Sequence, residues 1–160
     1  MTERSTEPSA PDLLLKLLKL GSFVSGPMRD GVCEPAGLAL ADLRALMALA
    51  GEGPLAGHDL VEITGLTAMN ISRVLAGLRE RGWIEDAVDP DNRRRKPVTL
   101  TPAGEAAYRA TLPDFEQVAE ALLERLSARD RRSLGRLTDL VVGELVRWIH
   151  AHHAGVKLHG

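Results

Sequence analysis

Two groups of polar and basic side chains near the middle of the chain could bind a nucleic acid. Residues 93–96 read Arg-Arg-Arg-Lys, and such cations bind phosphate oxygens without regard to base sequence. Asn70, Ser72 and Arg73 lie close together earlier in the chain, and their side chains can hydrogen-bond to base edges or to phosphates. Together these groups predict a surface that reads bases and neutralises phosphates. A solvated loop and an ordinary helix surface are the alternatives.

The charge of the whole chain hides this local excess. There are 20 basic and 22 acidic side chains, which gives a formal net charge of −2. Residues 1–66 carry 5 basic and 9 acidic groups (net −4), residues 67–104 carry 7 and 5 (net +2), and residues 105–160 carry 8 of each. Because phosphates respond to the local potential rather than to the total charge, this balance does not exclude a nucleic-acid partner.

Residues 67–81 are predicted to form the helix that presents the Asn, Ser and Arg group. Thr67 suits the N-cap, since its hydroxyl can accept a hydrogen bond from an unpaired amide, and Gly82 is typical just past a helix end. On a helical wheel, the apolar residues fall on one arc that would face a core: Ile71, Val74, Leu75 and Leu78. The opposite side presents Met69, Ser72, Arg73, Ala76 and Glu80, with Asn70 and Gly77 at its flanks. Gly77 is costly inside a helix, so a close approach to DNA or to a neighbouring helix, or simple tolerance, could explain it.

The elements around this helix predict a winged helix-turn-helix. Two helices are expected before it, one over residues 40–50 and a short one that stops at Gly65. After it, residues 83–88 and 98–100 can form strands, and Asp-Pro-Asp-Asn between them is strong turn chemistry, so the basic run sits at a hairpin tip. The expected fold class is mainly α with a small β wing, in which the third helix enters the major groove of DNA.

Long helices are expected at both ends of the chain. Residues 12–24 are apolar on nearly every side, and such a helix must be covered all round, for which a partner subunit is one solution. Gly26-Pro27 predicts an irregular connection over residues 27–37. Further on, Thr101-Pro102 predicts a helix that bends at Pro113 and continues through Leu126. Ser127-x-x-Asp130 then predicts the start of a last helix.

These elements divide the chain into four parts. Residues 1–11 are expected to be a disordered tail, and residues 12–37 an N-terminal dimerisation helix with its connection. Residues 38–104 form the predicted winged helix-turn-helix lobe, which would bind DNA. Residues 105–160 are expected to be C-terminal dimerisation helices.

Two stretches of the chain together resemble a known family. TAMNISRVLAGLRERGWI, at residues 67–84, has the pattern of a recognition helix, and DPDNRRRKPVTLTPAG, at residues 89–104, has that of a wing ending in Leu-Thr-x-x-Gly. This pairing resembles the signature of MarR-type transcriptional regulators, closely over residues 38–106 and more loosely over the terminal helices. The resemblance implies a homodimer with intertwined terminal helices that binds a pseudo-palindromic operator in double-stranded DNA. It further implies a repressor that a small-molecule effector releases.

The resemblance also indicates which residues would contact DNA. The recognition-helix candidates are Thr67, Met69, Asn70, Ser72 and Arg73, and the wing candidates are Asn92, Arg93, Arg94, Arg95 and Lys96. For Arg79 and Arg81, surface or salt-bridge roles are at least as plausible as phosphate contacts. In the family, an effector lodges between the winged lobe and the dimer helices, which here implies residues 12–24, 40–50 and 108–115.

Three positions depart from the family pattern. The wing of the family often bears an Asp-x-Arg pair whose arginine enters the minor groove; Asn92 and Arg94 occupy the matching positions, and an asparagine cannot form that salt bridge. Pro97 removes a strand amide, which predicts a short or bulged wing. Ala39 stands where a hydroxyl cap is expected for the helix over residues 40–50.

Other chemistry is open but has less support. Cys33 could be a redox-sensing thiol or a bystander, and the three imidazoles of His150, His152 and His153 could hold a metal or be solvated. No phosphate-cradling loop, nucleophile elbow or His-Glu-x-x-His is present, so neither an enzyme nor a cofactor is expected. The remaining alternatives are a winged-helix protein–protein module that does not bind DNA, and a thiol- or metal-responsive sensor of the same fold. No leader or run of ~18 apolar residues is found, so a cytoplasmic protein without membrane contact is expected.

Overall fold

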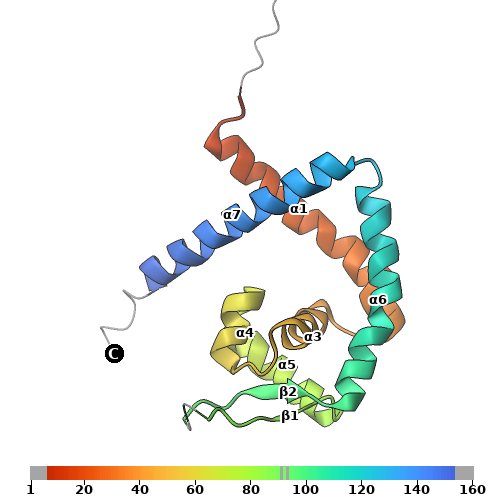
Figure 1. Ribbon diagram of the computed structural model, residues 1–160, viewed down its shortest axis with the longest axis vertical. Coiled ribbons are helices and arrows are strands. Elements are labelled where there is room, and N and C mark those ends of the chain that lie inside the picture. The colour runs from red at the N-terminus through yellow and green to blue at the C-terminus, as the bar shows by residue number, and fades with distance from the viewer. Residues whose placement is uncertain (1–6, 91, 93, 154–160) are drawn as a thin grey trace, which may run out of the picture. The chain divides into compact units, whose positions relative to one another are not determined.

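A computed structural model describes residues 7–90, 92 and 94–153 of the chain (Figure 1). The chain divides into two compact units, Met1–Val118 and Ala119–Gly160, and each is described here by itself. In the described ranges, no helix combines the length and the apolar character needed to cross a membrane.

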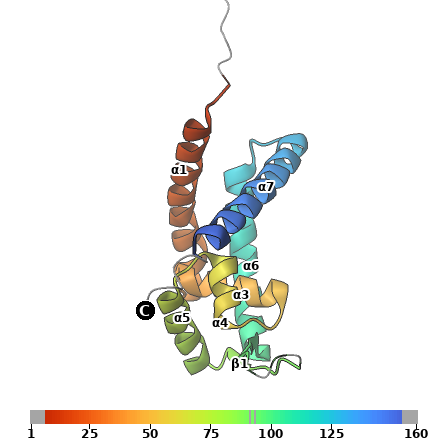
Figure 2. The same cartoon turned by 90° about the vertical axis from the view of Figure 1, so that its left-hand side faces the viewer.

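The first unit has the predicted winged helix-turn-helix order. A long N-terminal helix leads into three helices, a two-stranded hairpin and the start of another long helix (Figures 1 and 2). Its elements are α1 (Ala10–Met28), the π-helical turn η1 (Arg29–Cys33), α2 (Glu34–Ala36), α3 (Leu40–Glu52), α4 (Gly57–Thr64), α5 (Ala68–Glu80), β1 (Ile84–Asp86), β2 (Val98–Leu100) and α6 (Pro102–Leu123). The prediction of a mainly helical fold with a small β wing is confirmed.

A single apolar core holds α3, α4 and α5 together. Leu43, Leu46, Leu60 and Leu78 are at most 1% exposed, and Ile71 and Val74 from α5 join them. Burying a leucine side chain stabilises a fold by roughly 1.5 to 3 kcal/mol, so these few residues fix how α5 is mounted. The face of α5 that is predicted to be apolar is thus the one that the core holds.

The hairpin is short but is tied directly to this core. β1 and β2 pair antiparallel, with Ile84 opposite Leu100 and Asp86 opposite Val98. Ile84 and Val98 are each 3% exposed, and Val98 exchanges two backbone hydrogen bonds with Leu55, of 2.9 and 3.1 Å. The base of the wing is therefore fixed to the helical core by burial and by backbone hydrogen bonds.

The predicted first strand over residues 83–88 is wrong beyond Asp86. The Ala87 amide still donates to the Pro97 carbonyl at 2.9 Å, but Pro97 has no amide to return the bond, so the ladder ends there. The predicted effect of Pro97, a short wing, is confirmed, since each strand has three residues.

The predicted irregular connection over residues 27–37 is also wrong. α1 continues through Gly26 and Pro27, and the helical path passes through η1 and α2 before it ends at Gly37. Proline removes one helical hydrogen bond, but Val32 and Cys33, both 0% exposed, bury apolar surface that offsets this loss.

Two helices of the lobe that have alanine at the N-cap carry a capping carboxylate in their first turn. The Ala39 amide donates to Asp42 at 3.0 Å, and the Ala56 amide donates to Asp59 at 2.7 Å. Because the first amides of a helix have no internal partner, an acid in the first turn satisfies one of them and also complements the helix dipole. The hydroxyl expected at position 39 would accept from an amide of the first turn, so Asp42, which accepts from the Ala39 amide, supplies the other half of a capping box.

The second unit contains the end of α6 and all of α7 (Ala128–His153). The predicted start of the last helix at Ser127-x-x-Asp130 is confirmed, and the two residues form a capping box in which each accepts a hydrogen bond from the other's backbone amide at 3.2 Å. Arg131 donates to both carboxylate oxygens of Glu120, at 3.0 and 3.1 Å, which joins the two helices across their turn. α6 itself runs unbroken across Pro113 and ends at Leu123, before the predicted end at Leu126.

Large apolar side chains remain uncovered on two helices. On α1, Leu15 and Phe23 are 65% and 67% exposed, and on α7, Leu140 and Trp148 are each 56% exposed. Contiguous apolar faces of this kind mark surfaces that bind something further.

Candidate nucleic-acid interface

α5 presents its polar face to solvent as the wheel predicts. The Thr67 hydroxyl accepts from the Asn70 amide at 3.3 Å, which confirms the N-cap, and Gly82 ends the helix with a φ of +69°. Ser72 and Arg73 are exposed, and Met69 is 65% exposed. In the part of the chain that the structure describes, the Arg73 side chain has no hydrogen-bond or ion-pair partner. Because the core fixes the apolar side of α5, its exposed polar side can enter the major groove of DNA.

Gly77 is not explained by packing inside the chain. A Cβ at this position would meet no atom within 4 Å among the described residues. A close approach to a neighbouring helix of the lobe is therefore not its reason, which leaves a close approach to DNA or tolerance.

Two hydrogen bonds link Asp89, Asn92 and Arg94 in the loop between β1 and β2. Asp89 accepts from the Asn92 amide, and the Asn92 side chain accepts from the Arg94 amide, both at 3.1 Å. Asn92, which stands where the family has an acid, thus holds the backbone of Arg94 rather than its guanidinium. Arg94 is exposed, with no side-chain partner among the described residues.

Arg95, by contrast, is engaged inside the lobe. Its guanidinium donates to Asp89 at 3.1 Å and to Asp59 at the start of α4. The three side chains are 32%, 14% and 17% exposed, respectively. Partial burial raises the pKa of Asp59, but the Ala56 amide, Arg95 and His58 lower it by more, so its pKa lies below the ordinary value and the carboxylate stays charged.

The other basic residues of the region divide in the same way. Arg79 pairs with Asp86 at 2.7 Å, and Arg81 donates twice to the Gly37 carbonyl at 3.3 Å while stacking on the Trp83 ring. The ordinary structural roles considered for both arginines are therefore the ones observed.

Three of the predicted contact residues are exposed cations whose side chains have no partner among the described residues: Arg73, Arg94 and Lys96. They are free to bind DNA phosphates or bases. Arg93 lies outside the described residues.

Cys33 is buried at 0% exposure, which bears on the thiol-sensor alternative. Burial raises the pKa of its thiol, and the nearby Asp42 carboxylate raises it further, because both disfavour the thiolate. The neutral thiol is thus favoured in the fold, and this stabilisation is present below the ordinary pKa of 9.0 and is lost as the pH rises through the raised value.

We expect Cys33 to be unreactive in the folded protein. A disulfide reagent added at about pH 8 should label it slowly, since the thiolate is the reactive form, and labelling should become fast and complete in guanidinium chloride. The absorbance of the released thiol measures both rates. Rapid stoichiometric labelling of the native protein would contradict this expectation and would support a thiol sensor.

The histidines near the C-terminus are described in part. Among the side chains that the structure describes, no group of three or more potential metal ligands is present, and the His153 side chain lies outside them. His152 stacks on Trp148 with ring centroids 4.1 Å apart, and its Nδ1 lies 2.8 Å from the Trp148 carbonyl oxygen one turn back. The His152 imidazole therefore packs against its own helix, α7.

Comparison with known proteins shows which family the winged helix-turn-helix lobe matches. Residues 36–95 match the model of the MarR family. Among curated proteins, the chain is 29% identical over 99 residues to the HTH-type transcriptional repressor NicR from Pseudomonas putida. The match covers 62% of this chain and 62% of NicR, so it spans less than two thirds of that relative.

Solved structures give the same fold. A probable transcriptional regulator from Pseudomonas aeruginosa matches with a TM-score of 0.66 and 28% identity, over 79% of this chain and 94% of that one. BpsR from Bordetella bronchiseptica, a protein whose DNA binding is regulated by 6-hydroxynicotinic acid, matches with a TM-score of 0.69 and 23% identity, over 81% and 97%.

Proposed function

The chain belongs to the MarR family, and on that premise we propose that it is a homodimeric, sequence-specific DNA-binding regulator of transcription. One observation carries the proposal. In the same lobe, the exposed face of α5 and the wing tip hold Arg73 and Arg94, two cations with no partner among the described residues.

In this proposal α5 and the wing contact different parts of the DNA. α5 would lie in the major groove, where Asn70, Ser72 and Arg73 can reach base edges. The wing would follow the backbone, and Arg94 would enter the minor groove, where a cation meets strong negative potential. Binding would therefore combine sequence reading with salt-dependent phosphate neutralisation.

Dimerisation supplies the symmetry of the proposed site. The uncovered apolar faces of α1 and α7 are the surfaces that a second copy would bury. A two-fold dimer binds two equivalent half-sites, spaced roughly 10 base pairs apart for lobes that meet one face of the duplex.

Selection of bound sequences from random DNA at a fixed salt concentration tests this proposal. An inverted repeat with that spacing is the expected result. If no sequence is enriched although the protein is folded and dimeric, the proposal is wrong, and the winged-helix protein–protein module becomes the better reading.

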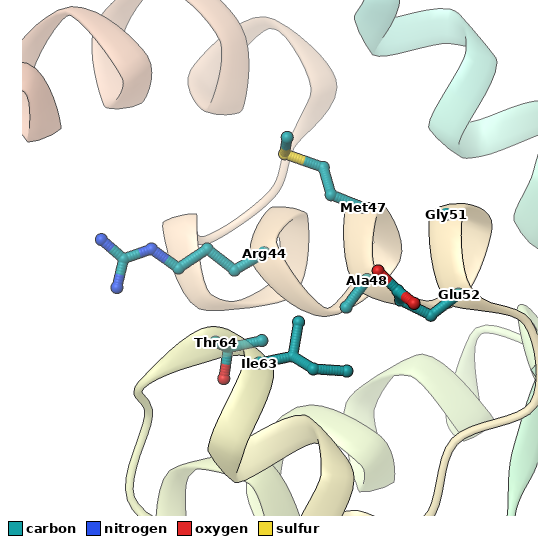
Figure 3. Close-up of a pocket in the computed structure, with 7 residues that line it drawn as sticks. All are labelled: Arg44, Met47, Ala48, Gly51, Glu52, Ile63 and Thr64. Carbon is teal, nitrogen blue, oxygen red and sulfur yellow. The ribbon is translucent and has the colours of Figure 1, made fainter. Parts of the chain in front are cut away.

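We further propose that a small aromatic acid acts as the effector. An open cavity of about 370 Å³ lies between α3 and α4 (Figure 3). Figure 3 shows Arg44, Met47 and Glu52 on α3, with Ile63 projecting from α4 toward α3. Arg44 has no side-chain partner among the described residues, so it could bind a carboxylate while Met47 and Ile63 contact a ring.

This cavity draws on one of the three regions predicted to form the effector pocket, residues 40–50, and the other two stay predictions. The ligand of BpsR suggests the first compound to try. An effector of this kind would release DNA only through a higher affinity for the state that does not bind DNA.

We expect 6-hydroxynicotinic acid or a related hydroxylated aromatic acid to release the selected DNA in a dose-dependent manner. Arg44→Ala should raise the concentration needed for half release by roughly tenfold or more, because it removes a charge-assisted hydrogen bond. Fluorescence anisotropy of labelled DNA measures both. Arg125→Ala, which changes an exposed arginine in the turn after α6 and outside the predicted pocket regions, is the matched control. An equal response in all three proteins would place the effector elsewhere.

A further inference from the structure

We propose that Arg95 is a positioning residue for DNA binding, which ties the wing tip to α4 and thereby places Arg94 relative to α5. The inference rests on the proposed function, because its readout is affinity for DNA. Arg95 would thus act inside the lobe, whereas Arg94 beside it would contact DNA directly.

The geometry around Arg95 is that of a bridge between two elements. One terminal nitrogen donates to Asp59, the third residue of α4, and the other donates to Asp89, at 3.1 Å, in the loop after β1. Both carboxylates are less than a fifth exposed. Pairs of this degree of burial are screened less than surface pairs, so they hold a fixed geometry more firmly.

On one side, the bridge leads to the recognition helix. Asp59 also accepts from the Ala56 amide at 2.7 Å, so its carboxylate is fixed at the start of α4. α4 packs on α5 through Leu60, which is 0% exposed, and a Cβ at Gly57 would lie 4.0 Å from Ile71. The position of Asp59 is therefore set by the same core that mounts α5.

On the other side, the bridge leads to the wing tip. Asp89 accepts from the Asn92 amide and Asn92 accepts from the Arg94 amide, both at 3.1 Å. A continuous series of contacts thus runs from α5 through Asp59, Arg95 and Asp89 to the backbone of Arg94.

The other hydrogen bonds described for the segment between β1 and β2 stay within that loop, such as those from the Ala87 amide to the Pro97 carbonyl at 2.9 Å and from the Arg95 amide to the Asn92 carbonyl at 3.0 Å. The bond from Arg95 to Asp59 is the one that joins this loop to a helix among the described residues.

The strands end at Asp86 and begin again at Val98, and Val88 between them is 86% exposed. Pro97 is buried where the loop rejoins β2, but the exposed part of the loop depends on polar contacts for a fixed conformation. A planar guanidinium can reach two separate carboxylates at once, which a lysine ammonium does less well.

The alternative is that Arg95 contacts a phosphate directly, and the two roles predict opposite effects of Asp59→Asn. Removing an acid near DNA lowers electrostatic repulsion and frees Arg95, so a direct contact predicts equal or tighter binding. Positioning predicts weaker binding, because Oδ2 of Asp59 accepts from both the Ala56 amide and Arg95. An asparagine oxygen in that place is uncharged and makes only the weaker neutral hydrogen bond to the guanidinium.

The experiment measures the affinity of the wild type, Asp59→Asn, Arg95→Ala and Arg95→Lys for the selected DNA over a range of salt concentrations. We expect roughly tenfold weaker binding for Asp59→Asn and Arg95→Ala, and a smaller loss for Arg95→Lys. The slope of log affinity against log salt should stay unchanged in Asp59→Asn. Binding by Asp59→Asn that equals or exceeds the wild type would overturn the inference.

A double-mutant cycle with Arg94→Ala separates positioning from a general loss of structure. If Arg95 acts through Arg94, Arg95→Ala should cost far less in the Arg94→Ala background than in the wild type. Additive losses would overturn the inference, even if Asp59→Asn weakens binding. All variants are compared well below their melting temperatures. If the wild type itself selects no DNA, the proposed function fails instead.

Discussion

Replacing Arg73 with alanine should weaken binding to the selected DNA by roughly 5- to 150-fold and relax the preference for one base of each half-site. The estimate corresponds to about 1 to 3 kcal/mol for a guanidinium that makes paired hydrogen bonds to a guanine. Arg73 is exposed on a helix whose opposite face is fixed by Ile71, Val74 and Leu78, so the contact would be lost without disturbing the fold. Binding to a panel of single-base variants of the site measures both effects.

The Arg73 result has a control and a distinct contrary outcome. Arg109→Ala removes an exposed arginine from α6, outside the proposed interface, and should leave affinity nearly unchanged. If Arg73→Ala instead weakens binding to every sequence equally and reduces the salt slope by about one, Arg73 contacts a phosphate and does not read a base.

The features of the lobe that sequence reasoning predicted are those with local signals. The cap at Thr67, the αL glycine at position 82 and the apolar arc of α5 all act over a few residues, so the pattern along the chain suffices to place the helix and its exposed face. The turn chemistry before Val98 placed the hairpin in the same way.

What the sequence could not show is which arginines are already used. Arg94 and Arg95 are neighbours of the same type in one basic run, yet one is exposed and the other is paired with Asp59, 36 positions earlier. A pairing over that distance depends on how α4 and the wing are packed, which no local pattern encodes. An acid in the first turn of α4 was the only available signal, and it equally suits a helix cap.

The continuation of α1 past Pro27 was missed for a related reason. Gly26-Pro27 is a strong local break, but Val32 and Cys33 lie in the core, and their burial decides the path of the chain. Gly31 contributes as well, since a Cβ there would lie 2.6 Å from a methyl group of Val118 on α6. Tertiary packing overrides local propensity where enough apolar surface is buried.

The glycine at the end of the Leu-Thr-x-x-Gly motif has a steric reason that gives the second large prediction. A Cβ on Gly104 would lie 2.0 Å from the Trp83 carbonyl oxygen, which accepts a hydrogen bond from the Thr101 amide at 3.0 Å. Gly104→Ala should therefore push the start of α6 away from the base of β1. We expect a loss of roughly 2 to 4 kcal/mol in the free energy of unfolding, from overpacking and a broken hydrogen bond.

Gly77→Ala is the matched control, because it adds the same methyl group where no described atom lies within 4 Å. Replacing a glycine with alanine inside a helix should stabilise the fold by ~1 kcal/mol. Urea unfolding of both variants should thus give shifts of opposite sign, and a stabilised Gly104→Ala would disprove the steric account. DNA affinity adds a further distinction. Gly104→Ala should weaken binding because the wing moves, whereas Gly77→Ala weakens it only if the helix backbone at this point touches DNA, which would explain why glycine stands there.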